Sequence, residues 1–306
     1  MPSAPRGSIR LVRFAGINLF LHWSWFLVAA LEIESRQGKY SSIAWNVLEY
    51  LALFLIVTLH EFGHAFACRQ VGGTADQIVL WPLGGVAYVD PPPRPGATLW
   101  SIAAGPLVNV ALAPLLFAAF VLSRSLGWSA TMPDLHKFVR AVFVLDVILL
   151  AFNLLPIYPL DGGQILRSLL WFALGRGRSL LVVTILGFLG VAGFVAVAFW
   201  TNSVWFGALS LFVLLNCWSG LRHARDLLRI AKLPRRAGFA CPECHAAPSV
   251  GELWKCGQCK QEFDTFQTQA ACPQCAAQHP ATRCLDCGRL SPTADWSAPL
   301  LIPAKG

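Results

Sequence analysis

The chain has 306 residues, of which 56% are hydrophobic and only 13% are charged. An ordinary soluble domain carries about a quarter charged residues, so the composition excludes a disordered chain and argues against a plain cytosolic enzyme. The formal net charge is +8, and most of the 10 cysteines lie between residues 241 and 287. These features indicate a membrane protein that ends in a small cysteine-rich module.

Six apolar stretches have the length of roughly 20 residues that a membrane-spanning helix needs. They cover about residues 15–33, 43–68, 98–122, 138–157, 179–200 and 203–221. The expected fold class is an α-helical polytopic membrane protein with about six transmembrane helices. A short segment after the second stretch, 77–89, is β-rich by composition.

Arginine and lysine are concentrated in alternate loops between these stretches. The positive-inside rule then predicts a multi-pass protein of the cell membrane with both termini in the cytoplasm. The basic run 222–236 is typical of a segment that binds an anionic inner leaflet. The expected organisation is a cytoplasmic segment 1–14, a transmembrane domain 15–222, a basic linker 223–238, a cysteine-rich module 239–290 and a disordered tail 291–306.

The second stretch contains the run His60-Glu61-Phe62-Gly63-His64. The i, i+4 spacing places both imidazoles on one helix face, where neutral ring nitrogens bind zinc and an adjacent glutamate serves as a base. Three ionisable side chains within a lipid-facing helix are costly and mark function. We therefore expect a catalytic zinc held by His60 and His64, with Glu61 beside it.

A catalytic zinc usually takes three protein ligands and keeps one position for water. Asp161 is the candidate for the third, because it follows the fourth stretch toward the same side of the membrane. Pro156 and Pro159 interrupt the chain just before it. Irregular backbone at membrane depth is tolerated only inside protein or along a water-lined cavity, as a buried metal site requires.

At this point the chain resembles the site-2 protease family of intramembrane zinc metalloproteases, peptidase family M50, in its compact bacterial form. The resemblance covers roughly residues 15–222 and rests on four elements in the family's order. They are His60-Glu61-x-x-His64, Pro82-Leu83-Gly84-Gly85-Val86, Gly105-Pro106-x-x-Asn109, and Asn153-x-x-Pro156 followed by Leu160-Asp161-Gly162.

The resemblance implies that His60, His64 and Asp161 bind the zinc and that Glu61 activates water. It implies that Asn109 positions the substrate by a hydrogen bond to the substrate backbone or to a developing oxyanion. The implied activity is cleavage of a transmembrane or membrane-associated protein at a site open to the cytoplasm. The segment 77–89 would offer an edge strand to the unwound substrate, or else form a re-entrant loop that plugs the site.

A second hypothesis is a polytopic zinc transporter or sensor. There His60, His64, Asp161 and Asp146 would form a permeation or sensing path, and the cysteine module would bind cytosolic zinc. The motif favours the peptidase, because transport does not require a glutamate next to the first histidine.

The cysteine module contains four Cys-x-x-Cys pairs, a strong metal signal. They are Cys241 and Cys244, Cys256 and Cys259, Cys272 and Cys275, and Cys284 and Cys287. Eight thiolates make two structural zinc sites, and the simplest pairing is sequential, the first two pairs sharing one ion and the last two another. Disulfides are the alternative, which a reducing compartment disfavours. The expected fold is a double zinc ribbon, and the whole chain would hold three zinc ions.

From residue 237 onward, acidic residues slightly outnumber basic ones, and each four-cysteine zinc site adds further negative charge. This charge argues against nucleic acid as a partner. It favours a protein contact through the zinc ribbons, either with the substrate, with a regulatory protein or with a second copy of the chain.

Overall fold

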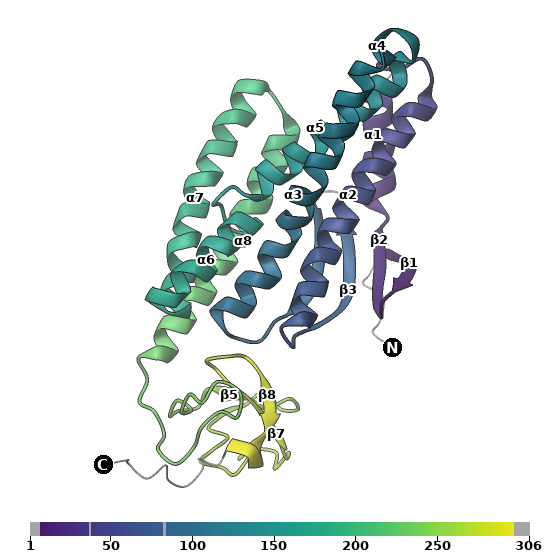
Figure 1. Cartoon of the computed structure of the whole chain (residues 1–306). Coiled ribbons are helices and arrows are strands. Elements are labelled where there is room, and N and C mark those ends of the chain that lie inside the picture. The colour runs from purple at the N-terminus through teal and green to yellow at the C-terminus, as the bar shows by residue number, and fades with distance from the viewer. Residues whose placement is uncertain (1–6, 37, 82–83, 297–306) are drawn as a thin grey trace, which may run out of the picture. The chain divides into compact units, whose positions relative to one another are not determined.

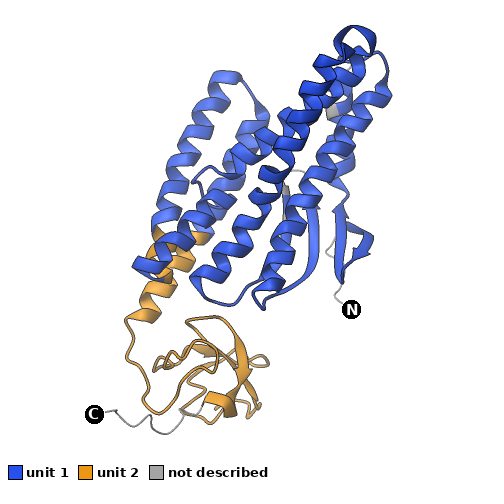
Figure 2. Cartoon of the chain, viewed as in Figure 1, with its two compact units in different colours: residues 1–175, 182–219 blue, residues 176–181, 220–306 orange. Residues whose placement is uncertain are grey.

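The computed structural model describes residues 7–36, 38–81 and 84–296. It divides into two compact units, coloured separately in Figure 2. The first unit comprises Met1–Gly175 and Val182–Ser219, and the second comprises Arg176–Leu181 and Gly220–Gly306. The first unit holds most of the helices and the N-terminal sheet, and the second holds the cysteine module (Figure 1).

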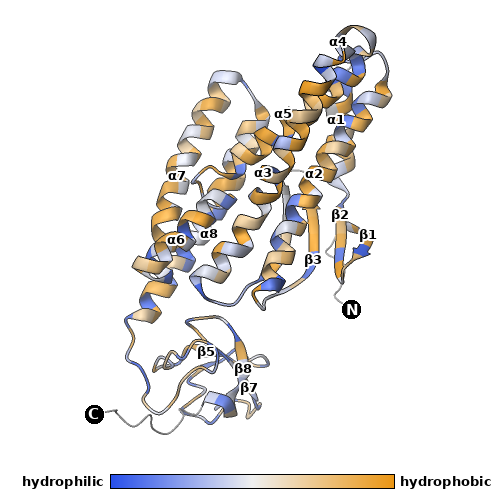
Figure 3. Ribbon diagram, viewed as in Figure 1, coloured by the Kyte–Doolittle hydropathy of each residue, from blue (hydrophilic) through white to orange (hydrophobic). Residues whose placement is uncertain are grey.

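The helical elements follow one another in the order shown in Figure 1. They are α1 (Ser24–Ser35), α2 (Ile43–Gln70), α3 (Pro95–Ser125), α4 (Trp128–Thr131), α5 (Pro133–Asn153), α6 (Asp161–Leu174), α7 (Arg176–Thr201) and α8 (Val204–Ala231). Within the described residues, α2, α3, α7 and α8 are the four helices that are long and apolar enough to cross a membrane. Apolar residues follow these helices along their length (Figure 3).

The count of four differs from the six spans expected. α5 is 21 residues long, but every 18-residue stretch of it contains Lys137, Arg140 and Asp146, more charged side chains than the apolar stretches of the other four helices carry. The first expected span, 15–33, is wrong for a different reason. It begins in a β-strand, and the helix that follows has 12 residues, about 18 Å at 1.5 Å per residue, against a hydrocarbon core of about 30 Å.

The strands at the N-terminus belong to a four-stranded sheet of order β1-β2-β3-β4. Its strands are β1 (Ser8–Phe14), β2 (Ile17–His22), β3 (Thr74–Trp81) and β4 (Gly84–Asp90). β2 pairs parallel with β3, and the other neighbours pair antiparallel. Ala15 and Gly16 join β1 to β2 with φ of 48° and 78°, the positive values that a two-residue type I′ turn requires.

The β-rich segment expected after the second stretch is therefore confirmed as the β3–β4 hairpin, although Pro82 and Leu83 lie outside the described residues. The sheet packs on the C-terminal half of α2 through one apolar core. That core includes Ile17, Leu19, Leu21, Val57, Phe62, Ala65, Cys68, Ile78 and Leu80. This packing places β4 beside the helical turn that carries the histidine motif.

The cysteine module contains two short hairpins, β5 (Trp254–Lys255) with β6 (Glu262–Phe263) and β7 (Ala281–Arg283) with β8 (Leu290–Pro292). A single 3₁₀ turn, Thr293–Trp296, follows β8. Trp296 is fully buried in the module's core. Residues 291–296, expected to belong to a disordered tail, are thus part of the fold, and the expectation for 297–306 falls outside the described residues.

Candidate functional site

Two histidines one turn apart on α2 form the centre of the candidate site. His60 and His64 are 4% and 6% exposed, and their Nε2 atoms lie 3.1 Å apart. The i, i+4 spacing brings the rings to one helix face, and that face is covered by neighbouring elements. The sequence predicted this pair, and the fold buries it.

Asp161, the first residue of α6, completes a triangle with the two rings. Its Oδ2 lies 3.0 Å from His60 Nε2 and 3.4 Å from His64 Nε2. A tetrahedral zinc site with bonds of roughly 2.0–2.1 Å has edges of about 3.3 Å. Edges of 3.0, 3.1 and 3.4 Å therefore fit three corners of such a site.

Glu61 lies in the same cluster and is 6% exposed. Its Oε2 accepts a hydrogen bond of 2.9 Å from the backbone N–H of Ala87 on β4. The strand approaches closely: a Cβ built on Gly85 would lie 2.2 Å from Glu61 Cγ. Glycine at position 85 is thus what lets β4 hold this carboxylate in place. Two carboxylates, one of them buried, beside two neutral histidines also need a compensating cation, which a divalent metal would provide.

The outer nitrogens of both histidines have partners on α3. His64 Nδ1 donates to the carbonyl oxygen of Ser101 at 2.9 Å, and His60 Nδ1 donates to Asn109 Oδ1 at 2.6 Å. With the proton on Nδ1, each Nε2 presents its lone pair to the centre of the triangle, as a metal-binding imidazole must. Partners of this kind orient metal-binding histidines in known zinc sites.

The role expected for Asn109 is not supported. Its side chain is fully buried behind His60 and does not line the described cavity. Both ends of its amide are taken, because Nδ2 donates to Asp146 Oδ1 at 2.7 Å while Oδ1 accepts from His60. An amide in that position contacts the candidate ligand His60 rather than a substrate.

A cavity of about 430 Å³ opens beside the triangle. His60, Glu61, His64 and Asp161 line it, together with apolar side chains of several helices and three amides, Asn153, Gln164 and Asn216. The sequence indicates an interhelical contact for Asn216 and no site role for Asn153 or Gln164. The signal for Asn153 was present, since it opens the same sequence motif that contains Asp161, whereas nothing in the pattern distinguished the other two.

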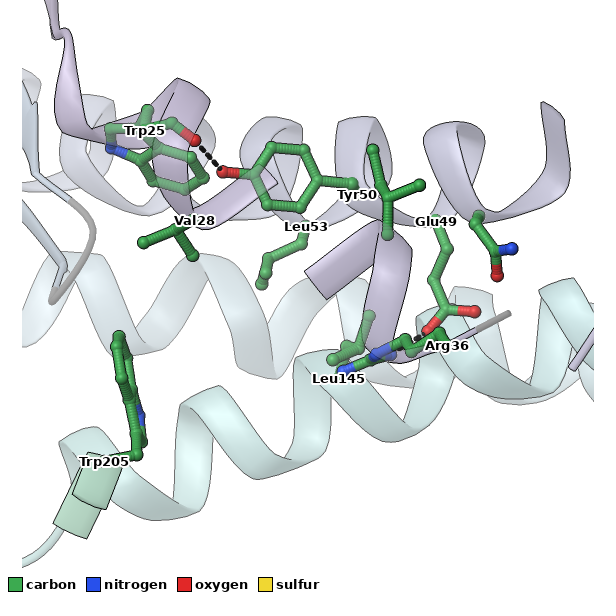
Figure 4. A pocket seen from close by; sticks show the side chains of 10 residues that line it. Trp25, Val28, Arg36, Glu49, Tyr50, Leu53, Leu145 and Trp205 are labelled. Carbon is green, nitrogen blue, oxygen red and sulfur yellow. Dashed lines mark hydrogen bonds and ion pairs between the residues drawn. The ribbon is translucent and has the colours of Figure 1, made fainter. Parts of the chain in front are cut away.

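A second cavity, of about 210 Å³, lies between α1, α2, α5 and α8 (Figure 4). There Tyr50 donates to the Trp25 carbonyl oxygen at 2.8 Å, and Arg36 pairs with the buried carboxylate of Glu49. Glu49 precedes His60 by about 16 Å of helix at 1.5 Å per residue. None of the metal-ligand clusters found in the described chain lies in this cavity. The side chains around this cavity connect α1 to α2, and the cavity is separate from the candidate site.

The eight module cysteines form two four-cysteine groups, as expected, but their pairing is nested rather than sequential. One group contains Cys241, Cys244, Cys284 and Cys287, and the other contains Cys256, Cys259, Cys272 and Cys275. The sulfur atoms of neighbouring cysteines lie 3.5 to 3.8 Å apart, close to the edge of about 3.8 Å in a tetrahedron with zinc–sulfur bonds of about 2.3 Å. All eight are free thiols rather than disulfides.

The nested pairing has a structural cause. The N–H of Ala240 donates to the carbonyl oxygen of Trp296 at 2.9 Å, so the beginning and the end of the module lie side by side. The first Cys-x-x-Cys pair, or knuckle, is thereby placed next to the last one. One apolar core, which contains Trp254, Phe263, Phe266 and Trp296, contacts cysteines of both groups.

In the second and third Cys-x-x-Cys pairs, the turn favours a thiolate at the first cysteine. The backbone N–H of Cys259 lowers the pKa of the Cys256 thiol to about 5, with help from the N–H of Gln258 and against the effect of burial. The N–H of Cys275 likewise lowers the pKa of Cys272. A lowered pKa supplies the thiolate that a metal binds.

The comparisons with known proteins agree with this geometry. Residues 49–197 match the model of peptidase family M50. A zinc metalloprotease of Methanocaldococcus jannaschii is 34% identical over 182 residues, 59% of this chain and 50% of that protein. YwhC of Bacillus subtilis is 30% identical over 155 residues, 40% of this chain and 70% of YwhC. The chain spans about half the length of the first of these relatives.

The solved structure of a site-2 protease from Methanocaldococcus jannaschii is also similar. It matches with a TM-score of 0.51 and 27% identity, covering 70% of this chain and 95% of that one. The similarity in fold therefore includes most of the helical unit.

Proposed function

Because this chain belongs to peptidase family M50, the site-2 protease family, we propose that it is an intramembrane zinc metalloendopeptidase. It would hydrolyse a peptide bond in or near a transmembrane segment of a membrane protein, in regulated intramembrane proteolysis. One observation carries the proposal: His60, His64 and Asp161 meet in a metal-sized triangle, with Glu61 beside them, at a cavity among membrane-length helices.

The residues divide the chemistry between them. A zinc ion held by His60, His64 and Asp161 supplies Lewis acidity, which polarises the scissile carbonyl and acidifies water. Glu61 takes a proton from the attacking water and delivers it to the leaving amine, a contribution of about 10²- to 10⁴-fold in rate. The apolar walls of the cavity exclude bulk water and strengthen these interactions.

The substrate contacts follow from the cavity lining. Gly85, Ala87 and Val89 alternate along β4 and all line the cavity. β4 is an outer strand of the described sheet, so an unwound substrate can pair with it as an added strand. Asn153 replaces Asn109 as our candidate for an amide that contacts the substrate, because Asn153 lines the cavity and Asn109 does not.

The cysteine module would hold two structural zinc ions, because both four-cysteine groups have tetrahedral dimensions. We propose that its partner is a protein: the substrate, a regulator or a second copy of the chain. Arg235 and Arg236 of the basic linker pair with Asp286 and Asp264 of the module. The earlier part of the basic run, Arg222, Arg225, Arg229 and Lys232, is exposed and would contact an anionic inner leaflet, with both termini cytoplasmic.

The alternative, a zinc transporter or sensor, required a path through His60, His64, Asp161 and Asp146. Asp146 is fully buried and does not line the described cavity, so the four side chains do not share one space. This observation favours the peptidase over the transporter.

The test uses the full chain in proteoliposomes with a reporter, a single transmembrane helix containing a helix-destabilising Asn-Gly pair. Glu61→Gln should retain three zinc ions per chain and lose cleavage, whereas Glu34→Gln, an exposed position on α1, should cleave as wild type does. His60→Ala should hold two zinc ions. Cleavage by Glu61→Gln, or zinc flux into the vesicles without cleavage, would overturn the proposal.

A further inference from the structure

Behind His60 lies a chain of side chains for which the proposed chemistry has no use. Asn109 of α3 contacts His60, and Asp146 of α5 contacts Asn109, with hydrogen bonds of 2.6 and 2.7 Å. Asn109 and Asp146 are both fully buried. Three separate helices thus contribute one side chain each to a continuous hydrogen-bonded chain that ends on His60 Nδ1, in the ring whose Nε2 would bind zinc.

Burying a carboxylate in an apolar helical unit costs free energy, so the presence of Asp146 requires a physical explanation. Asp146 Oδ1 accepts from Asn109, but Asp146 Oδ2 has no hydrogen-bond partner among the described residues. A buried polar atom without a partner destabilises the fold, so helix packing alone does not explain the aspartate. The explanation must lie in what the bonded oxygen does.

The bonded oxygen determines which way the amide of Asn109 points. A carboxylate only accepts hydrogen bonds, so Asp146 binds the NH₂ end of the amide and directs its carbonyl oxygen to His60. A carbonyl oxygen also only accepts, so His60 must carry its proton on Nδ1. Its Nε2 is then unprotonated and presents a lone pair to the metal.

The opposite orientation would be harmful. If Asn109 turned its NH₂ group to His60, that group would favour a lone pair on Nδ1 and a proton on Nε2, where the metal binds. His64 has no such ambiguity, because its Nδ1 faces the backbone carbonyl of Ser101, which cannot turn. Of the two rings, only His60 depends on a side chain whose orientation must itself be fixed.

We propose that Asp146 is a positioning residue, which acts through Asn109 to hold His60 in the orientation and tautomer that zinc requires. This inference deepens the proposed function and rests on it, because it assumes that His60 binds zinc. Outer partners of this kind usually change metal affinity by about 10- to 100-fold when replaced. The proposal therefore predicts an effect on zinc binding rather than on folding or on the proton transfer by Glu61.

The experiment measures how tightly the full chain in detergent retains its third zinc ion, by dialysis against graded chelator and metal analysis. Asp146→Asn lets the amide of Asn109 turn, and we expect the third zinc to bind about 10- to 100-fold more weakly. Thermal unfolding should stay close to wild type. Raising free zinc should restore cleavage in Asp146→Asn but not in Glu61→Gln, since only the first variant lacks metal.

A charge exchange gives the sharper test. In the double variant Asn109→Asp with Asp146→Asn, a carboxylate accepts directly from His60 Nδ1, and the new amide donates to that carboxylate. Zinc affinity should return to near the wild-type value, because every hydrogen bond from His60 Nδ1 outward is made again. Asp134→Asn is the matched control, because Asp134 lies on the same helix and hydrogen-bonds Ser41 at its first turn.

The outcomes separate the two proposals. Wild-type protein with only two zinc ions would overturn the proposed function and this inference together. Three zinc ions in wild type, with wild-type affinity in Asp146→Asn, would overturn the inference alone. If Asp146→Asn does not yield folded protein, the double variant decides. Wild-type zinc affinity in the double variant supports the positioning role of Asp146, and loss of the third zinc refutes it.

Discussion

A single methyl group added at Gly105 should remove the metal site. Gly105 lies on α3 where that helix faces the two histidines. A Cβ at this position would lie 2.3 Å from His64 Nε2 and 2.7 Å from His60 Nε2, whereas ordinary contact begins at 3.4 Å. The methyl group would also approach the place where a zinc ion must sit, about 2.0–2.1 Å from each nitrogen.

Neither side can retreat easily. The rings are held by Ser101 and Asn109, both on α3 itself, so a ring that moves away loses its hydrogen bond. α3 cannot shift either without opening its contact with α2, where a Cβ on Gly63 would already lie 2.7 Å from the Ala104 carbonyl oxygen. A displacement of about 1 Å is therefore forced on the ligands, while metal sites require their distances to within about 0.2 Å.

We expect Gly105→Ala to weaken the third zinc at least about 100-fold, which corresponds to roughly 2.8 kcal/mol. Metal analysis of the purified full chain should find two zinc ions rather than three, and cleavage of the reporter should disappear. Gly193→Ala on α7 is the matched control, because a Cβ there meets nothing within 4 Å. It should be neutral or slightly stabilising, by up to about 1 kcal/mol. Retention of three zinc ions and full cleavage by Gly105→Ala would show that the site geometry is wrong.

Three more predictions follow from the same contacts. Gly85→Ala should retain the third zinc but lose cleavage, since its methyl group would lie 2.2 Å from Glu61 Cγ and not near a ligand. The double variant Cys241→Ser with Cys284→Ser should lose one zinc ion in metal analysis, because both cysteines belong to one group. The double variant Cys241→Ser with Cys256→Ser should lose two, because these cysteines belong to different groups. Sequential pairing would give the reverse result. Chelation of zinc from the module should unfold both sites in one transition by tryptophan fluorescence, since one core contacts both.

The histidine motif was readable from sequence because its chemistry is local. One helix and a spacing of four residues determine that His60 and His64 share a face. The motif around Asp161 supplied the partner, because a segment that alone is typical of a loop turn indicates a metal ligand when it is paired with the histidine motif. The amides were not readable in this way. Asn109 and Asn153 are both in motifs, and only the packing of α3 and α5 decides that Asn109 contacts His60 while Asn153 lines the cavity.

The first expected span was wrong because hydropathy does not separate a buried strand from a helix. Ile17–His22 is almost wholly buried, so it lacks the alternation of apolar and polar residues that identifies a half-exposed strand. Its partner β3 comes more than fifty residues later, beyond the reach of any local pattern. The zinc pairing failed for a similar reason, since each knuckle is local but the choice of partner depends on the hydrogen bond between Ala240 and Trp296.

The long-range contacts also explain how four ionisable side chains are tolerated together in an apolar unit. Three neighbouring elements satisfy them: α3 accepts hydrogen bonds from both rings, the N–H of Ala87 on β4 donates to Glu61, and Asp161 at the start of α6 contacts the two rings. A buried polar group is destabilising only while its partners are missing. The N-terminal sheet is thus part of the site, because pairing and packing hold β4 against α2. Disrupting either the α2–α3 contact or this sheet should therefore impair cleavage. Only disruption of the α2–α3 contact should also weaken zinc binding, because α3 carries the hydrogen-bond partners of His60 and His64.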